Sequence, residues 1–259
     1  MFSTKERGRW IMRNILVTGA GGGLGAAMVR KFVEEGDYVF AADIKFEVAQ
    51  TVAELYPGKA EALELDVSNS ASVQHAIDTI CRENELHVLV NNAGIQYRAK
   101  IEDFPEDKWD MLQDVMLKGP FLMTKYAFPY MKKQQHGRIV NISSVHGEMA
   151  TPEKVAYVAA KHGVIGLTRV AALEGAMHGI TVNAVLPGPV KTPLIIQQLK
   201  DLEESKGMSE ADALDEIVYP KQAMQRFITA DEIANSVFFI SSNQATGITG
   251  EALNVSGGM

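Results

Sequence analysis

A serine, a tyrosine and a lysine lie close together in this sequence, and their types and spacing suit proton transfer at an alcohol. Tyr157 and Lys161 are four residues apart, which places both on one face of a helix, and Ser144 lies thirteen residues before the tyrosine. Hydride removal from an alcohol requires a base at the hydroxyl group, but a free phenol titrates near ~10. Because a nearby ammonium favours the phenolate, we expect Tyr157 to be the acid and base. We expect Lys161 to lower its pKa and Ser144 to bind the reacting oxygen.

The elements that must position these residues alternate along the chain. Short apolar runs typical of buried strands are followed by longer amphipathic stretches typical of helices. Because the apolar runs lack polar alternation, the sequence predicts seven parallel strands covered on both faces, which is a doubly wound α/β fold. The expected strands are 15–19, 38–43, 62–67, 87–92, 138–143, 181–188 and 252–256, and the expected helices are 23–35, 46–55, 69–84, 107–133, 155–178 and 231–241.

The chain contains no linker or internal repeat that would divide it. We expect residues 14–259 to form a single domain, preceded by an extension over 1–13. One segment, about 189–225, is long, polar and bounded by prolines. Insertions of this length commonly have a function, and we expect a helical lid over the substrate. A pair of surface helices without a function is the alternative.

A glycine-rich turn follows the first expected strand and opens the first helix. Glycines let the backbone approach a pyrophosphate at a helix N-terminus, so we expect a dinucleotide at Thr18, Gly19, Gly23 and Leu24. Asp43 ends the second strand about twenty residues on, where a carboxylate accepts hydrogen bonds from the adenosine ribose. The same carboxylate repels a 2′-phosphate, so the sequence predicts NAD rather than NADP.

The third and fourth expected strands both end in polar or small residues. The carboxyl ends of parallel strands share one edge of the sheet, where ligands bind. We therefore expect the adenine and the middle of the cofactor to lie beside these ends, although each alone is also compatible with ordinary turn chemistry. The residues concerned are Asp66, Val67, Asn92 and Gly94.

Composition and charge exclude several classes of function. The formal net charge of −7 provides no basic face for nucleic acid, and no apolar run approaches the ~20 residues of a membrane span. The single cysteine, Cys81, excludes an internal disulfide, and the six histidines form no pattern typical of a metal site. The first residues lack the apolar core of a secretion signal. We expect a cytoplasmic protein that binds a small molecule.

The motifs TGxxxGxG, NNAG, the serine and YxxxK stand in an order and spacing that resemble the short-chain dehydrogenase/reductases. The resemblance covers 14–258 and implies a Rossmann-type fold, a nicotinamide cofactor, a homotetramer, and catalysis by the serine, tyrosine and lysine named above. Tyr157 and Lys161 are also expected to contact the cofactor, together with Pro187 and Val190.

Several hydrogen-bonding side chains converge on the expected position of the alcohol. His146 and Lys154 flank the serine and the tyrosine, Gln96 follows the fourth strand, and the expected lid carries Gln197 and Gln198. Converging donors, one of them cationic, suit a carboxylate on the substrate. A solvated loop is the alternative for His146 and Lys154.

The runs NNAGIQ, SVHG, KVAY and AAKHGVIGLT resemble the bacterial D-3-hydroxybutyrate dehydrogenases within that family. This resemblance implies NAD-dependent oxidation of (R)-3-hydroxybutyrate to acetoacetate, with the reacting oxygen held by Ser144 and Tyr157. The residues implied to bind the carboxylate are Gln96, His146, Lys154 and Gln198.

Two positions depart from the patterns of these relatives. Met116 stands where the family usually has a catalytic asparagine, and methionine cannot order a water molecule through amide hydrogen bonds. Pro189 stands where the hydroxybutyrate dehydrogenases often have a tryptophan, which leaves room for a slightly longer hydroxy acid. Two other functions stay compatible with the sequence. One is a short-chain reductase acting on a sugar or a 3-oxoacyl thioester, and the other is a nucleotide-binding protein without turnover.

Overall fold

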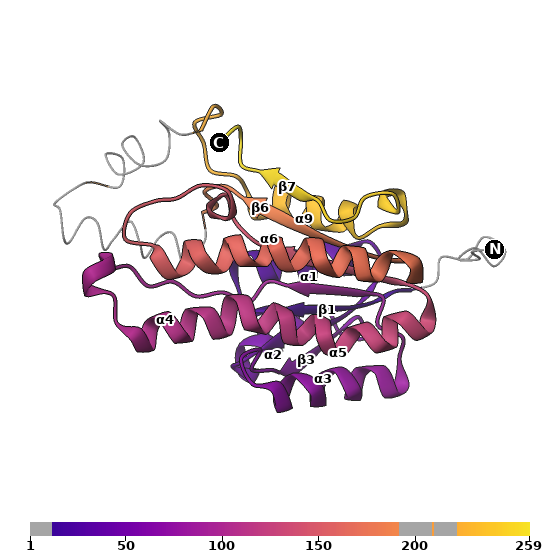
Figure 1. Cartoon of the computed structure of the whole chain (residues 1–259). Coiled ribbons are helices and arrows are strands. Elements are labelled where there is room, and N and C mark those ends of the chain that lie inside the picture. Colours follow the sequence, from indigo (N-terminus) through magenta and orange to yellow (C-terminus); the bar gives the residue numbers. More distant parts are fainter. Residues whose placement is uncertain (1–11, 192–208, 210–221) are drawn as a thin grey trace.

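The computed structural model (Figure 1) describes residues 12–191, 209 and 222–259, and its strands form a seven-stranded parallel sheet. The strand order is β3-β2-β1-β4-β5-β6-β7, so the order reverses between β1 and β4. This confirms the predicted doubly wound fold. The strands are β1 Asn14–Thr18, β2 Tyr38–Asp43, β3 Ala60–Glu64, β4 Val88–Asn91, β5 Gly137–Ile142, β6 Ile180–Pro187 and β7 Ala252–Val255.

Helices cover both faces of the sheet. They are α1 Gly23–Glu34, α2 Phe46–Ala53, α3 Ser70–Glu83, α4 Glu106–Gln113, α5 Gly119–Gln134, α6 Val155–Gly175 and α9 Ala230–Ile240, with short 3₁₀ turns η1 Ile101–Asp103, η3 Val145–Gly147, η4 Ala176–His178 and η7 Asn243–Ala245. In β1, Ile15 and Val17 pack in a core that includes α1 and α9, whereas Leu16 packs in a second core with α3, α5 and α6. Alternate side chains of one strand thus enter opposite cores, as a sheet covered on both faces requires.

The third strand begins two residues and ends three residues earlier than predicted. β3 pairs with β2 from Ala60 to Glu64, and Asp66 and Val67 lie in the turn that follows. Several side chains of β3 are exposed because it lies at the edge of the sheet, so its apolar pattern marks its limits poorly.

The helix predicted over 107–133 is interrupted by a π-helical segment, η2 Asp114–Lys118, between α4 and α5. Pro120, in the first turn of α5, has no N–H to donate to the residue four positions earlier, which is Met116. The preceding residue, Gly119, donates its N–H to the Asp114 carbonyl five residues back, which is the hydrogen-bond pattern of a π-helix. The widened turn contains the position at which the family usually has an asparagine.

The two ends of the expected lid lie side by side. Val190 and Ile228 form a parallel bridge, and the Ile228 N–H donates to the Pro189 carbonyl at 2.9 Å. Of the segment 189–225, the structure describes 189–191, 209 and 222–225; the expected helical lid otherwise lies outside the described residues.

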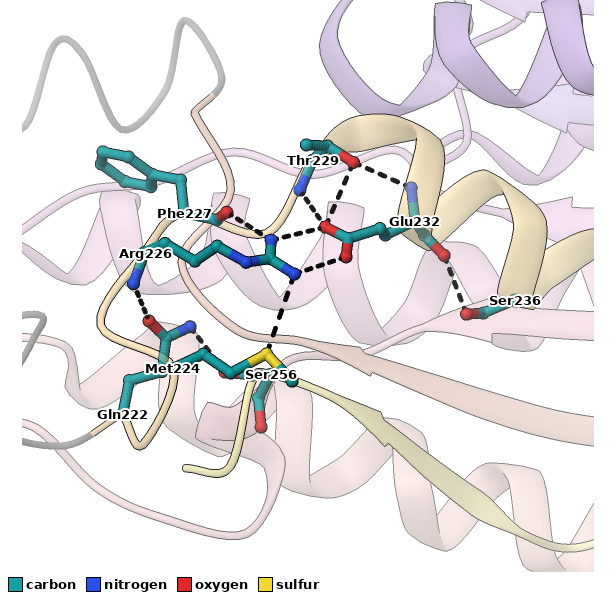
Figure 2. Close-up of polar contacts among 8 residues, drawn as sticks. All are labelled: Gln222, Met224, Arg226, Phe227, Thr229, Glu232, Ser236 and Ser256. Carbon is teal, nitrogen blue, oxygen red and sulfur yellow. Dashed lines mark hydrogen bonds and ion pairs between the residues drawn. The ribbon is translucent and has the colours of Figure 1, made fainter.

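A polar network fixes the chain where it returns from this segment (Figure 2). Buried Gln222 donates to the Ser256 carbonyl at 2.7 Å and accepts from the Arg226 N–H at 2.9 Å. Arg226 binds both carboxylate oxygens of Glu232, at 2.7 and 2.9 Å, and holds the pKa of Glu232 at about 2. Glu232 also closes a capping box with Thr229 at the start of α9. These contacts connect the base of the expected lid to β7 and α9.

The first described residues are part of the fold. Arg13, which the sequence placed in an extension, pairs with Asp37 at 2.5 Å, and its carbonyl accepts from the Tyr38 N–H. No helix among the described residues is long and apolar enough to cross a membrane.

Candidate active site

The glycine-rich turn after β1 leads directly into the N-terminus of α1, which no side chain caps. Gly19 and Gly23 have φ values of +61° and +55°, which favour glycine, and a Cβ on Gly25 would lie 2.1 Å from the Gly19 carbonyl oxygen. The N-cap of α1 is Gly22, with no capping side chain and no acidic residue in the first turn. The first N–H groups of this helix therefore suit an anionic group such as a pyrophosphate. Leu24, also expected here, is partly buried against the core beneath the turn.

Asp43 lies at the carboxyl end of β2, directly beside the same turn. Its carboxylate accepts hydrogen bonds from the Gly21 N–H at 3.1 Å and the Lys45 N–H at 3.2 Å. A Cβ added at Gly21 would approach this carboxylate to 2.9 Å, so the turn and the acid are in close contact. Asp43 can still accept hydrogen bonds from ribose hydroxyls, because each oxygen has more than one lone pair.

Thr18 and Asn92 hold together the ends of β1 and β4, where the strand order reverses. The Thr18 hydroxyl accepts from the Asn92 N–H at 2.9 Å and the Ala93 N–H at 3.1 Å, and Asn92 Nδ2 donates to the carbonyls of Thr18 and Gly19. Ligands bind at this point in doubly wound sheets. Gly94, the next residue expected at the cofactor, is exposed.

Asp66 and Val67 occupy the turn after β3. Asp66 Oδ1 accepts from the N–H and hydroxyl of Ser68, at 2.9 and 2.6 Å, and so stabilises the turn itself. Val67 is buried, and a Cβ on Gly119 would contact its side chain at 3.1 Å. Both residues follow the carboxyl end of β3, at the edge of the sheet where the sequence places the cofactor, and each has a structural contact.

The structure brings the serine, tyrosine and lysine together at the carboxyl end of β5. Ser144 and Lys161 are buried, and a side-chain hydrogen bond joins Ser144 to Tyr157. Lys161 Nζ donates to the Ile142 carbonyl at 2.7 Å and lies 5.6 Å from the centre of the Tyr157 ring. The Ser143 hydroxyl donates to the Lys161 carbonyl, which ties α6 to the end of β5.

His146 joins this group through both ring nitrogens. Nδ1 lies 3.3 Å from Ser144 Oγ, and Nε2 lies 2.9 Å from Thr151 Oγ1. Its ring meets the Tyr157 ring edge to face, with the ring centres 5.8 Å apart. The alternative of a solvated loop is therefore wrong for His146, which packs directly on the tyrosine.

Gln96 and Lys154 approach from two different loops. Gln96 lies between Ile95 and Tyr97, which pack against the same apolar cluster as Tyr157. The Oε1 atom of Gln96 is buried and has no hydrogen-bond partner among the described residues. Lys154 is the N-cap residue of α6, the helix that carries the tyrosine, and is partly buried. Gln198 and its alternative Gln197 lie outside the described residues.

Pro187 is the last residue of β6, and Val190 lies three residues after it. Both are buried, and Val190 belongs to the core that includes Ile228. The Val190 side chain therefore packs inward, in the core. No three metal-ligating side chains cluster within 12–191, 209 and 222–259.

Residues 19–259 match the family model described as enoyl-(acyl carrier protein) reductase. The chain belongs to the short-chain dehydrogenase/reductase family. It is 44% identical, over 94% of its length and 96% of the relative, to an uncharacterized oxidoreductase, YxjF, of Bacillus subtilis. It is 36% identical to a D-beta-hydroxybutyrate dehydrogenase of Rhizobium meliloti, over 95% and 98% of the two chains. It is also 36% identical to a 3-oxoacyl-[acyl-carrier-protein] reductase, FabG, of Thermotoga maritima, over 94% and 96%. The protein is thus an oxidoreductase of this family, whose members typically use NAD or NADP.

In this short-chain dehydrogenase/reductase, burial controls the proton affinities of the tyrosine and the lysine. Burial raises the pKa of Tyr157 above 10.0, although the hydrogen bond with Ser144 acts in the opposite direction. Burial lowers the pKa of Lys161 from 10.5 to about 8. The net pKa shift of Tyr157 is therefore upward, opposite to the lowering expected from the sequence. The reason is that removal from water disfavours both charged forms.

Met116 places an apolar side chain where this family usually has an asparagine. It is fully buried in a cluster with Leu112, Ala156 and Ala160, against which Tyr157 also packs. A cluster of this composition provides no side-chain donor for a water molecule. Any proton path from the tyrosine in this chain must therefore use other groups.

Three contacts of the site were not predicted from the sequence. Lys161 donates to the Ile142 carbonyl, His146 contacts Thr151, and Arg98 pairs with Glu153 between the loops that carry Gln96 and Lys154. A backbone carbonyl has no sequence signal. Thr151 lies in a turn rich in polar residues, and the two members of the ion pair are 55 residues apart, so neither could be recognised from spacing.

Proposed function

We propose that this protein catalyses the reversible, NAD-dependent oxidation of (R)-3-hydroxybutyrate to acetoacetate. The observation that carries the proposal is the packing of His146 on the serine and the tyrosine, with Lys154 directly before the helix that carries the tyrosine. Ser144, Tyr157 and Lys161 can move a proton at an alcohol, and His146 packs on the first two. Lys154 begins the same helix that carries the tyrosine. A substrate held here would have a hydroxyl and an anion only a few atoms apart.

Each residue of the proton-transfer group has a separate role in this proposal. Tyr157 receives the hydroxyl proton during oxidation, and Ser144 donates a hydrogen bond to the reacting oxygen. Lys161, held by the Ile142 carbonyl, keeps a positive charge beside the phenol and binds the nicotinamide ribose. The cofactor supplies the hydride acceptor when it is bound.

Asp43 supports NAD as the cofactor. Its carboxylate lies at the glycine turn, where it accepts from two backbone N–H groups. A 2′-phosphate at this position would meet a negative charge, whereas ribose hydroxyls would find an acceptor. The uncapped N-terminus of α1 supports a pyrophosphate in the same site.

The carboxylate of the substrate would be bound at the rim by Gln96 and Lys154. The Gln96 amide would donate from Nε2 to this carboxylate, because its Oε1, which is buried and has no partner among the described residues, can only accept a hydrogen bond. His146 can reach the same anion through Nε2 if it exchanges its bond to Thr151. Gln198, outside the described residues, is the fourth member of the proposed set.

The decisive experiment measures NADH formation with (R)-3-hydroxybutyrate and with (S)-3-hydroxybutyrate. We expect turnover of the R enantiomer alone, and no turnover by the Tyr157→Phe variant. Binding of NAD without reduction by any member of a panel of short hydroxy acids would contradict the proposal and favour a nucleotide-binding protein without turnover.

The Lys154→Ala variant tests the carboxylate site. Loss of a charge-assisted hydrogen bond of about 1.5–3 kcal/mol raises KM for the hydroxy acid by roughly 10- to 100-fold, with unchanged affinity for NAD. The matched control is Lys133→Ala, which removes an exposed lysine at the far end of α5. An equal loss of activity toward 2-butanol, which has no carboxylate, would refute the role of Lys154 as an anion ligand.

A second candidate function is reduction of a 3-oxoacyl thioester, because 3-oxoacyl-[acyl-carrier-protein] reductases are as similar to this chain as the hydroxybutyrate dehydrogenases are. Such a reductase acts on a long, neutral thioester. Oxidation of NADPH and NADH with acetoacetyl-CoA separates the two candidates. A strong preference for NADPH and the thioester would favour the second.

A further inference from the structure

An ion pair joins the two loops that carry Gln96 and Lys154. Arg98 Nη2 lies 2.6 Å from Glu153 Oε2, and the two side chains are 24% and 35% exposed. The Ala99 N–H donates to the Glu153 carbonyl at 3.1 Å, so the backbone also takes part. We call Arg98 and Glu153 the interloop pair. Because Gln96 precedes Arg98 by two residues and Lys154 follows Glu153, the pair fixes the separation of the two loops beside these side chains.

Glu153 has a backbone conformation that residues with a side chain rarely adopt. Its φ is +68°, in the left-handed region that favours glycine or asparagine. A residue in this region persists only where the surrounding contacts hold it. Here those contacts are the Arg98 ion pair and the hydrogen bond from Ala99. The conformation of Glu153 sets the direction in which the chain enters α6 through Lys154.

The charge of Glu153 would oppose an anionic substrate unless it is neutralised. A carboxylate directly next to Lys154 reduces the positive potential that this lysine provides. Arg98 binds that carboxylate at short range, so Arg98, Glu153 and Lys154 together carry a net charge of +1. Without Arg98 the same group would be neutral, because Glu153 would cancel the charge of Lys154, and an incoming carboxylate would meet no net positive charge.

From these contacts we infer that the interloop pair is a specificity-determining element: Arg98 neutralises Glu153 and holds Lys154 and Gln96 at the separation that a short substrate carboxylate requires. Arg98 and Glu153 act as positioning residues and do not contact the reacting atoms. The inference rests on the proposed function in that it assumes an anionic substrate at this rim.

The inference predicts an asymmetry between the two single variants. Arg98→Met leaves the Glu153 carboxylate without its arginine and raises KM for (R)-3-hydroxybutyrate by about tenfold, because this carboxylate then cancels the positive charge of Lys154. Glu153→Gln removes the pair without adding a negative charge, and raises KM by no more than about threefold. The double variant behaves like Glu153→Gln, since the offending carboxylate is absent.

The experiment measures KM, kcat and the affinity for NAD in these three variants. Arg30→Met is the matched control, because Arg30 forms an exposed pair with Asp231 between α1 and α9, away from the rim. We expect unchanged kcat and NAD affinity in all of them, and unchanged KM for 2-butanol. Equal increases in KM for Arg98→Met and Glu153→Gln would overturn the inference, because an ion pair with only a structural role is lost equally whichever of the two residues is replaced. No increase in KM for either variant would also overturn it.

A binding measurement separates this inference from the proposed function. Butyrate in the presence of NADH has the carboxylate but no reacting hydroxyl, and its affinity is obtained by calorimetry. If the wild type binds butyrate about tenfold more tightly than Arg98→Met but oxidises no hydroxy acid, the inference is supported and the proposed function fails. If the wild type oxidises hydroxybutyrate while Arg98→Met has unchanged KM, the inference alone fails. If the wild type neither oxidises hydroxybutyrate nor binds butyrate, both fail.

Discussion

Replacement of Lys161 by methionine should stabilise the protein while abolishing its activity. Burial lowers the pKa of this lysine from 10.5 to about 8, so at pH 7 the folded protein holds a cation that burial disfavours. Each tenfold change in proton affinity is worth about 1.4 kcal/mol, and the cost is therefore about 3 kcal/mol. Methionine has a similar length and no charge. Its gain is offset by the Ile142 carbonyl, which loses its 2.7 Å hydrogen bond at a cost of about 1–3 kcal/mol.

The net gain in the free energy of unfolding is roughly 0–2 kcal/mol at pH 7, which corresponds to a rise in Tm of up to about 8 °C. The dependence on pH is the sharper test. Between about pH 8 and 10.5 the unfolded chain keeps a proton on Lys161 that the folded protein has released. The stability of the wild type therefore rises with pH across this window relative to the variant, and the advantage of methionine disappears.

The assay is chemical denaturation of both proteins at fixed protein concentration, at pH 7, 8, 9 and 10, with NADH formation measured in parallel. Loss of the lysine should reduce kcat by about 10²–10⁴-fold. Lys133→Met, at an exposed position on α5, is the control and should change neither quantity. Identical pH dependence of stability in the wild type and Lys161→Met would refute the conclusion that burial sets the pKa of Lys161.

Two further predictions concern the cofactor and the departure from the family pattern. Asp43→Asn removes the negative charge at the glycine turn, and we expect the ratio of kcat/KM for NAD to that for NADP to fall by at least about tenfold; an unchanged ratio would show that Asp43 does not select the cofactor. Met116→Asn places an amide in an apolar, fully buried cluster, so the free energy of unfolding should fall by about 1–3 kcal/mol in denaturant titrations. An unchanged stability would mean that the amide finds a partner there, and a rise in kcat would mean that it restores a water-mediated proton path.

The sequence was sufficient for features that depend on local spacing. The four-residue interval between Tyr157 and Lys161 places them on one face wherever a helix forms, and the structure has that helix. The glycine turn could be recognised because the steric constraints that require glycine at Gly19 and Gly25 arise between residues only a few positions apart. The doubly wound parallel sheet followed from alternating strands and helices, whereas its strand order comes from the structure.

Other features depend on residues that only the folded chain brings together. The π-helical turn at Met116 arises where Pro120 cannot donate a backbone hydrogen bond, but the sequence pattern alone predicted one continuous helix. The limits of β3 were also misplaced, since its edge position leaves its side chains partly exposed.

What the sequence by itself determined is therefore the set of reactive groups and the fold that carries them. What only the tertiary structure decided is their environment: the direction of the pKa shift of Tyr157, the bond from Lys161 to the Ile142 carbonyl, and the pairing of Arg98 with Glu153. The physical reason is that helix and turn signals arise from contacts between near neighbours in the chain. Burial and charge pairing instead depend on segments that are far apart in the sequence and meet only after folding.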